Sequence, residues 1–246
     1  MTRWLVTIGM LLCAPTLRAQ TQDITFTTGD GFVLSGTFSA ARLGGPGVLL
    51  LHPCDADRQV YETLAAMLNT AGYSVLALDF RGAGGSTGGE YTNLDAQRET
   101  IVERMPGDVD AALDFMTSQS TVNPRALAVV GGGCAVNQGV QAARRHEEIR
   151  TLVLLSGAAD AEGEAYVTNS GVPILGIASE EDSQGGAAIR SIIDRSTNLD
   201  SRVEIFGGAG NAASLLTNEL DLPAEIVIWF RSVLPTGGYG LPPAIR

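Results

Sequence analysis

The sequence contains few of the residues that carry proton transfer, thiol exchange and cation chemistry. Its 246 residues include two histidines, three cysteines and no lysine, and its 16 arginines are outnumbered by 27 acidic residues. The formal net charge of −11 disfavours binding to nucleic acid and to anionic membranes. No Cys-x-x-Cys motif is present, which argues against a thiol-redox protein. We expect no metal ion and no cofactor.

The N-terminus has the three regions of a secretory signal. Arg3 precedes an apolar stretch from Leu5 to Cys13, and the segment Ala14-Pro15-Thr16-Leu17-Arg18-Ala19 that follows ends in a small residue. The stretch is too short to cross a bilayer as a helix, which favours a cleaved signal over a retained anchor. We predict that residues 1–19 are a signal peptide and that the mature protein is periplasmic or secreted, without stable membrane insertion.

Hydrophobic patterning predicts one α/β domain over residues 20–234, followed by a C-terminal tail over residues 235–246. Strands alternate with helices, which predicts a mostly parallel, twisted sheet of about eight strands with helices on both faces. The first two strands, separated by Gly29-Asp30-Gly31, are expected to form an antiparallel hairpin. We expect strands at 23–28, 32–40, 47–52, 74–80, 126–130, 150–156, 173–179 and 202–206, and helices at 60–71, 107–118, 135–144, 187–195 and 224–233.

The segment from Ala126 to Gln138 is the pattern around which the rest is organised. An apolar run rich in small and β-branched residues stops at three consecutive glycines, and a helical stretch follows. This is a strand, a tight turn and a helix. In α/β-hydrolases such a unit is the nucleophile elbow, which holds a reactive side chain clear of the sheet.

Three stretches together resemble the α/β-hydrolase superfamily. They are the apolar strand that ends in His52-Pro53, the Asp-Phe-Arg-Gly-Ala-Gly-Gly-Ser loop from Asp79 to Ser86, and the elbow. The segment between Gly157 and Val172 is too short for a lid domain. The resemblance is therefore to small lidless esterases of the dienelactone-hydrolase type, and it implies the α/β-hydrolase fold.

The resemblance implies a triad in the order nucleophile, acid, base, and the elbow lacks its nucleophile. The residues two before and two after the reactive one must be small. If Gly133 holds the reactive position, these residues are Gly131 and Ala135, both small; if Cys134 holds it, one of them is the β-branched Val136. We favour Gly133, and Cys134 remains the alternative nucleophile.

The acid position is kept and the base is replaced. By resemblance the acid is Asp182, and Asn211 stands where the family has histidine. Asparagine cannot accept a proton near neutral pH, so the triad is degenerate. His52 follows the third strand, where relatives carry a histidine that shapes the oxyanion loop, and His146 is expected on the surface. We expect a pocket at the carboxyl ends of the strands, among His52, Cys54, Arg81, Gly133, Asp182 and Asn211.

The two cysteines outside the signal fall at the positions that the resemblance assigns to the oxyanion hole. The two amides of that hole would belong to Cys54 and Cys134. We predict a disulfide between them, because amides that point at one oxygen bring their residues within bridging distance and an oxidising compartment preserves the bond. The alternative is two buried thiols that never meet.

These observations lead to two hypotheses about function. The leading one is a catalytically inactive protein that binds a small apolar ligand or a protein partner. The alternative is an ester hydrolase with Cys134 as nucleophile and His52 or an unassigned group as base.

Overall fold

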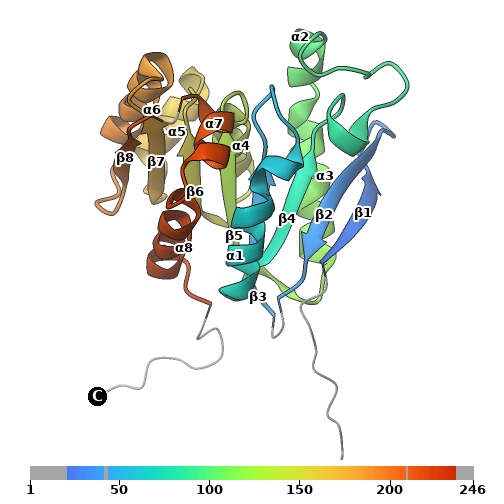
Figure 1. Ribbon diagram of the computed structural model, residues 1–246. Helices are drawn as coiled ribbons and strands as arrows, with labels where there is room; N and C mark the ends of the chain where they lie inside the picture. The colour runs from blue at the N-terminus through green and yellow to red at the C-terminus, as the bar shows by residue number, and fades with distance from the viewer. Residues whose placement is uncertain (1–20, 42–43, 209, 237–246) are drawn as a thin grey trace, which may run out of the picture.

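An eight-stranded sheet of order β1-β2-β4-β3-β5-β6-β7-β8 forms the centre of the molecule (Figure 1). The computed structural model describes residues 21–41, 44–208 and 210–236, so the predicted signal peptide and most of the predicted tail lie outside the described residues. In chain order the elements are β1 (Thr21–Thr27), β2 (Val33–Ser39), β3 (Gly45–Leu51), η1 (Arg58–Tyr61), α1 (Glu62–Thr70), β4 (Ser74–Asp79), η2 (Gly84–Ser86), α2 (Arg98–Val102), α3 (Met105–Ser118), β5 (Val122–Gly132), α4 (Ala135–Arg145), β6 (Ile149–Leu155), α5 (Ala161–Ser170), β7 (Ile174–Ser179), α6 (Ser183–Arg195), β8 (Arg202–Phe206), α7 (Ala212–Asn218) and α8 (Leu222–Val233).

The strand pairing confirms the predicted fold class. β1 pairs with β2, and β2 with β4, in antiparallel fashion, whereas the six strands β4, β3, β5, β6, β7 and β8 pair with one another in parallel. The carboxyl ends of β3 to β8 therefore meet at one edge of the sheet. Side chains that follow these ends can converge on a single site.

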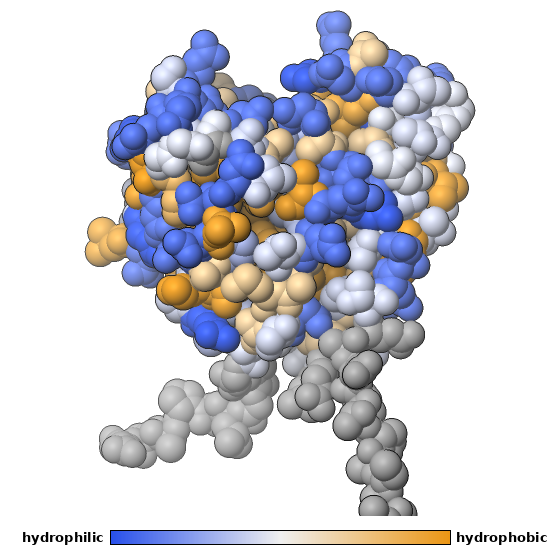
Figure 2. All heavy atoms as spheres, viewed as in Figure 1, coloured by the Kyte–Doolittle hydropathy of each residue, from blue (hydrophilic) through white to orange (hydrophobic). Residues whose placement is uncertain are grey.

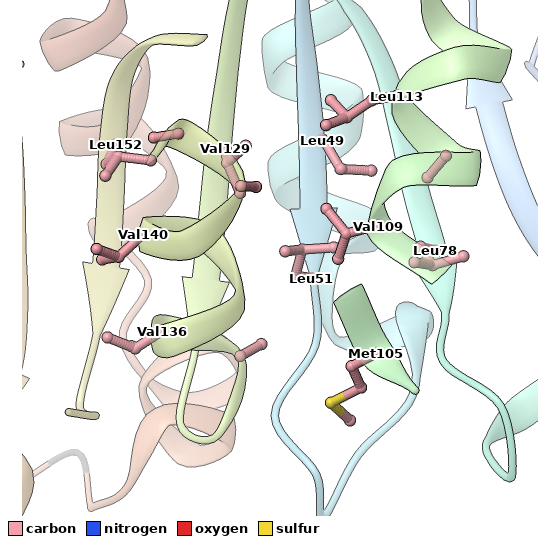
Figure 3. Close-up of a cluster of buried hydrophobic side chains, with 14 of the residues drawn as sticks. Leu49, Leu51, Leu78, Met105, Val109, Leu113, Val129, Val136, Val140 and Leu152 are labelled. Atoms are coloured by element: carbon pink, nitrogen blue, oxygen red, sulfur yellow. The ribbon is translucent and has the colours of Figure 1, made fainter. Parts of the chain in front are cut away.

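Successive side chains of the buried strands point to opposite faces of the sheet, which divides the core into two layers. Leu49 and Leu51 of β3 belong to the cluster beneath α3 to α6, whereas Val48 and Leu50 belong to the cluster beneath α1, α7 and α8. Figure 3 shows Leu49 and Leu51 facing Val109 of α3 across the first layer. Each fully buried leucine stabilises the fold by about 1.5–3 kcal/mol relative to an exposed one.

Three of the observed helices were not predicted. α5 and α7 start at capping residues: the Asp160 side chain accepts a hydrogen bond from Gly163 N at 2.8 Å, and the Asn211 side chain accepts one from Ser214 N at 3.0 Å. A side chain of this kind satisfies an amide that the first helical turn leaves without a partner. α2 has only five residues, too few to show a helical period.

Candidate functional site

The elbow between β5 and α4 has a glycine at its strained position. Gly133 has φ +55°, in the left-handed region, whereas Cys134 has φ −63° and an ordinary helical conformation. A Cβ atom at Gly131 would lie 2.6 Å from the carbonyl oxygen of Ala135, so the turn excludes larger residues there. The residue that the turn presents above the sheet is therefore Gly133, which has no side chain to act as a nucleophile.

The predicted disulfide between Cys54 and Cys134 is present, and its Cα atoms are 5.8 Å apart. It joins the loop after β3 to the N-cap residue of α4. The alternative of two thiols that never meet is wrong. While this bond is intact, Cys134 has no free thiolate.

The predicted acid and base positions serve as helix caps. Asp182 Oδ1 accepts a hydrogen bond from Gly185 N at 2.9 Å at the start of α6. Asn211 caps α7 and donates from Nδ2 to Asp55 Oδ2 at 3.1 Å. No hydrogen bond between Asp182 and Asn211 is found in the described part of the chain, so these two residues do not form an acid–base pair.

His52 is fully buried, so the prediction that it lines the pocket is wrong. Its Nε2 accepts a hydrogen bond from Phe80 N at 3.0 Å, and its Nδ1 therefore carries the proton and donates to Pro53 O at 2.7 Å. Burial lowers the pKa of His52 below its ordinary value, which keeps the ring neutral. His52 holds the loop after β3 against the loop after β4 and has no access to a substrate.

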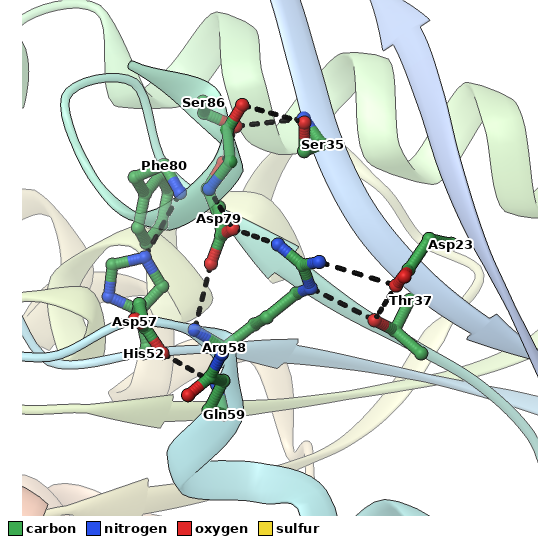
Figure 4. A network of polar contacts seen from close by, with 11 residues as sticks. Asp23, Ser35, Thr37, His52, Asp57, Arg58, Gln59, Asp79, Phe80 and Ser86 are labelled. Atoms are coloured by element: carbon green, nitrogen blue, oxygen red, sulfur yellow. Dashed lines mark hydrogen bonds and ion pairs between the residues drawn. The ribbon is translucent and has the colours of Figure 1, made fainter.

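A polar network beside His52 holds the same two loops (Figure 4). Asp79, at the end of β4, is fully buried and accepts hydrogen bonds from Arg58 N at 2.8 Å and from Gly85 N at 2.7 Å. The Arg58 guanidinium forms an ion pair with Asp79 and donates to Thr37 Oγ1 at 2.9 Å. These bonds satisfy the buried carboxylate and fix η1 against the sheet.

Arg81 also lies beneath the surface, with 1% of its side chain exposed, so its predicted place in the pocket is wrong. Its Nε donates to Asp108 at 2.9 Å, its Nη1 donates to Asp30 at 2.9 Å, and its guanidinium lies about 5 Å from the ring centres of Phe32 and Tyr91. Burial alone would lower the pKa of Arg81, but the two carboxylates raise it. Arg81 therefore holds the loop after β4 to α3 as a permanent cation.

A cavity of about 170 Å³ lies directly over the elbow. It is lined by Pro53, Cys54, Asp55, Arg98, Gly133, Cys134, Ser156, Asn211 and Ala212. Of the six residues predicted for the pocket, Cys54, Gly133 and Asn211 line this cavity, whereas His52, Arg81 and Asp182 do not.

The cavity shares Cys54 and Asp55 with a larger groove of about 770 Å³. The groove runs between the loop after β3, the segment 93–95 before α2, and α7. In Figure 2 the molecule is hollowed at the top, between the side that carries α6 and α7 and the side that carries α2. A ligand could therefore reach the elbow from this face.

Ser156, which directly follows β6, was not among the predicted site residues. Ser156 has φ +45°, the only positive value among the described residues other than glycine, and 7% of it is exposed. Its hydroxyl oxygen is buried and has no hydrogen-bond partner. The backbone is held on both sides of Ser156. Ser156 N donates to Ile177 O at 2.8 Å, and the next residue packs so closely against the elbow that a Cβ at Gly157 would lie 2.2 Å from Gly133 O. A polar residue at the end of a parallel strand was the available signal.

The described residues contain no candidate metal site and no candidate membrane span. No group of three or more histidine, cysteine, aspartate or glutamate residues in the described ranges is arranged to hold a metal ion. None of the helices in those ranges is both long and apolar enough to cross a membrane.

Several solved structures of hydrolases are similar to this one. The esterase Pf2001 of Pyrococcus furiosus has a TM-score of 0.69 at 17% identity, covering 87% of this chain and 93% of its own. The dienelactone hydrolase of Anabaena variabilis has a TM-score of 0.70 at 18% identity, covering 88% and 99%. A predicted CIB-like hydrolase of Thermoplasma acidophilum has a TM-score of 0.71 at 13% identity, covering 87% and 100%. At such identities the similarity shows the fold.

Sequence comparison gives the family. Two uncharacterized proteins of Mycobacterium tuberculosis, Rv2307c of strain H37Rv and MT2364 of strain CDC 1551, are 32% identical to this chain over 127 residues. That match covers 50% of this chain and 42% of each relative, so the chain spans less than half the length of these relatives. Residues 47–179, more than half of the chain, match the family model "Serine aminopeptidase, S33" (Hydrolase_4). The chain therefore belongs to this family, within the α/β-hydrolase superfamily.

Proposed function

We propose that this protein is a secreted or periplasmic α/β-hydrolase-fold protein that binds a small ligand over the elbow and does not hydrolyse it. The observation that carries this proposal is the glycine at the left-handed position of the turn. A glycine there keeps the backbone geometry of the elbow but supplies no atom that could attack a carbonyl.

The neighbouring groups do not replace the missing chemistry. Cys134 Sγ is bonded to Cys54, and Asn211 cannot act as a general base. His52 is buried, with its Nε2 lone pair already bonded to Phe80 N. General-base assistance alone contributes on the order of 10²–10⁴ in rate, so its loss together with the nucleophile supports an inactive site.

Two features support secretion. The first is the signal-like pattern of residues 1–19. The second is the disulfide, which persists in oxidising compartments and is rare in reducing ones.

The alternative function, ester hydrolysis by Cys134, requires the disulfide to open. Reduction would free a thiol at the N-terminus of α4, where the helix dipole favours the thiolate. The test must therefore be run on both oxidised and reduced protein.

The experiment measures hydrolysis of p-nitrophenyl acetate and butyrate, together with labelling by a fluorophosphonate, with and without dithiothreitol. We expect neither reaction in either state. The control is Gly133→Ser combined with Asn211→His: a Cβ at Gly133 would lie 3.3 Å from Pro53 Cβ, a contact relieved by a small shift, although the φ of +55° strains any side chain there. Turnover that Cys134→Ala abolishes would contradict the proposal and establish the cysteine hydrolase.

A further inference from the structure

The cavity over the elbow contains an unpaired hydrogen-bond donor. Ser156 lines it, is more than nine-tenths buried, and its hydroxyl has no partner. A buried polar group without a partner destabilises the fold, and a non-glycine residue in the left-handed region adds strain. A serine hydroxyl reaches a new acceptor by rotation about a single bond. An acceptor atom in the cavity would remove the first of these two costs.

Two residues with unpaired backbone amides line the same cavity. Cys54 and Cys134 both line it, and neither backbone amide donates a hydrogen bond to another residue in the described part of the chain. Cys134 is also the N-cap of α4, an eleven-residue helix whose positive end points toward the elbow. The set of a hydroxyl, two amides and a helix N-terminus favours a ligand with a negatively charged oxygen.

The charged side chains limit the ligand to a single negative charge. Arg98 is the only cation that lines the cavity, its side chain is half exposed, and it is already paired with Asp95. Asp55 lines the same cavity and accepts a hydrogen bond from Asn211. Because Asp95 already pairs with Arg98 and Asp55 adds a carboxylate, the lining offers no unshared cation, and its hydrogen-bond donors can compensate one negative charge but not two.

The apolar lining and the volume of the cavity indicate which group is attached to the negatively charged oxygen of the ligand. Pro53, Ala212 and the disulfide-bonded Cys54 and Cys134 provide an apolar part of the lining. The volume of about 170 Å³ equals that of about five to six water molecules in the liquid. The ligand therefore has a short apolar chain attached to its anionic group.

We propose that this cavity binds a short-chain monocarboxylate, whose carboxylate accepts hydrogen bonds from the Ser156 hydroxyl and from the amides of Cys54 and Cys134. The inference rests on the proposed binding function and names its ligand class. Ser156 is thereby assigned as the residue that selects a carboxylate.

The experiment is a ligand-observed NMR titration with sodium propionate at fixed ionic strength, repeated with Ser156→Ala and Ser183→Ala. Ser183 is an exposed serine at the start of α6, outside the cavity, and serves as the matched control. A hydrogen bond to a charged group contributes about 1.5–3 kcal/mol, so Ser156→Ala should weaken propionate binding by about 10- to 100-fold. Ser183→Ala should leave it within about twofold of the wild type. If the alanine variant does not fold, Ser156→Gly replaces it, because glycine accepts the left-handed conformation.

Inorganic phosphate is the competing probe. Saturable propionate binding that weakens in the Ser156 variant, without displacement by equimolar phosphate, supports the proposal. Equal affinity in the Ser156 variant, or tighter binding of phosphate, overturns it. Absence of propionate binding also overturns it, and the ester assay then decides the wider proposal independently: no turnover leaves the inactive site in place, and Cys134-dependent turnover refutes it as well.

Discussion

Two regions at the carboxyl edge of the sheet differ in how their polar groups are used. After β3 and β4, the side chains of His52, Asp79 and Arg81 are buried, and the structure supplies each of them with hydrogen-bond partners. After β7 and β8, the side chains of Asp182 and Asn211 reach the surface and cap the helices that start there. The first region holds the fold together, and the second holds the positions that catalysis would need.

The difference shows which part of a family resemblance carries function. A buried carboxylate or guanidinium that loses its partner costs several kcal/mol, so the residues of the first region are required for folding. A nucleophile or base has no such structural role, and its position can take a glycine or a cap without cost to the fold. The Asp79–Arg81 stretch therefore identifies the architecture and gives no information about activity.

The strongest test of the stabilising role of the first region is the substitution Arg81→Ala. The change strands Asp108, whose side chain is fully buried, and removes the cation from between Phe32 and Tyr91. We expect a loss of about 3–5 kcal/mol in the free energy of unfolding, measured by urea denaturation. Arg144→Ala is the control, because the Arg144–Glu162 pair is exposed and should change stability by less than about 1 kcal/mol. Equal effects of the two substitutions would show that the first region is not the stabilising one.

The disulfide ties the loop after β3, in the first region, to the elbow after β5, and its removal should have the next largest effect. It closes a loop with a sequence separation of 80, for which the chain-entropy estimate is about 4 kcal/mol. We expect the double variant Cys54→Ser, Cys134→Ser to unfold at a correspondingly lower urea concentration, with a similar shift for the wild type in dithiothreitol. A reduced protein as stable as the oxidised one would mean that the bridge contributes nothing to the fold.

The pH dependence of stability tests the buried state of His52. Burial lowers its pKa in the folded protein, whereas the unfolded chain has the ordinary value of about 6.5. The stability that this residue contributes is therefore present above pH of about 6.5 and lost as the pH falls, at up to about 1.4 kcal/mol per pH unit. The pKa of Asp23 and that of Asp160 are also lowered, but their contribution is lost only at more acidic pH, below about 4.

His52→Gln should flatten this dependence between about pH 7 and pH 5. The free energy of unfolding of both proteins, measured by urea denaturation at several pH values, gives the two slopes. Parallel slopes would mean that His52 is accessible to protons in the folded state, contrary to its position in the first region.

Most of the fold could be predicted because buried strands and long helices leave periodic apolar patterns. β3 and β4 read as continuous apolar runs, and α8 has its apolar residues on one side. The short helices α2, α5 and α7 could not be predicted in the same way, because α5 and α7 depend on capping bonds made by Asp160 and Asn211 rather than on a long apolar stripe.

The features of the candidate site also fall into those that could be predicted from the sequence and those that could not. The Cys54–Cys134 bridge could be predicted, because the family geometry places the two residues on neighbouring loops. The buried positions of His52 and Arg81 could not, because sequence order shows that a residue follows a strand but not whether its side chain turns into the core or into the cavity. For Ser156 the only signal was a polar residue after a predicted strand, because its importance depends on a backbone angle and a missing partner, which are both three-dimensional properties.

The smallest effect, and the one that most sharpens the comparison, is expected at Ser156. Replacement by glycine relieves the left-handed strain of about 1–3 kcal/mol and removes the unpaired hydroxyl, at an entropic cost of about 0.4–1 kcal/mol in the unfolded chain. These contributions sum to a gain of at least about 1 kcal/mol, measured by urea denaturation. Ser156→Ala removes the hydroxyl but keeps the strain, so it should gain less than the glycine variant. A glycine variant less stable than the wild type would show that the serine conformation is not strained. A gain in stability together with the loss of propionate binding would mean that Ser156, unlike the buried groups after β3 and β4, is kept at the expense of the fold.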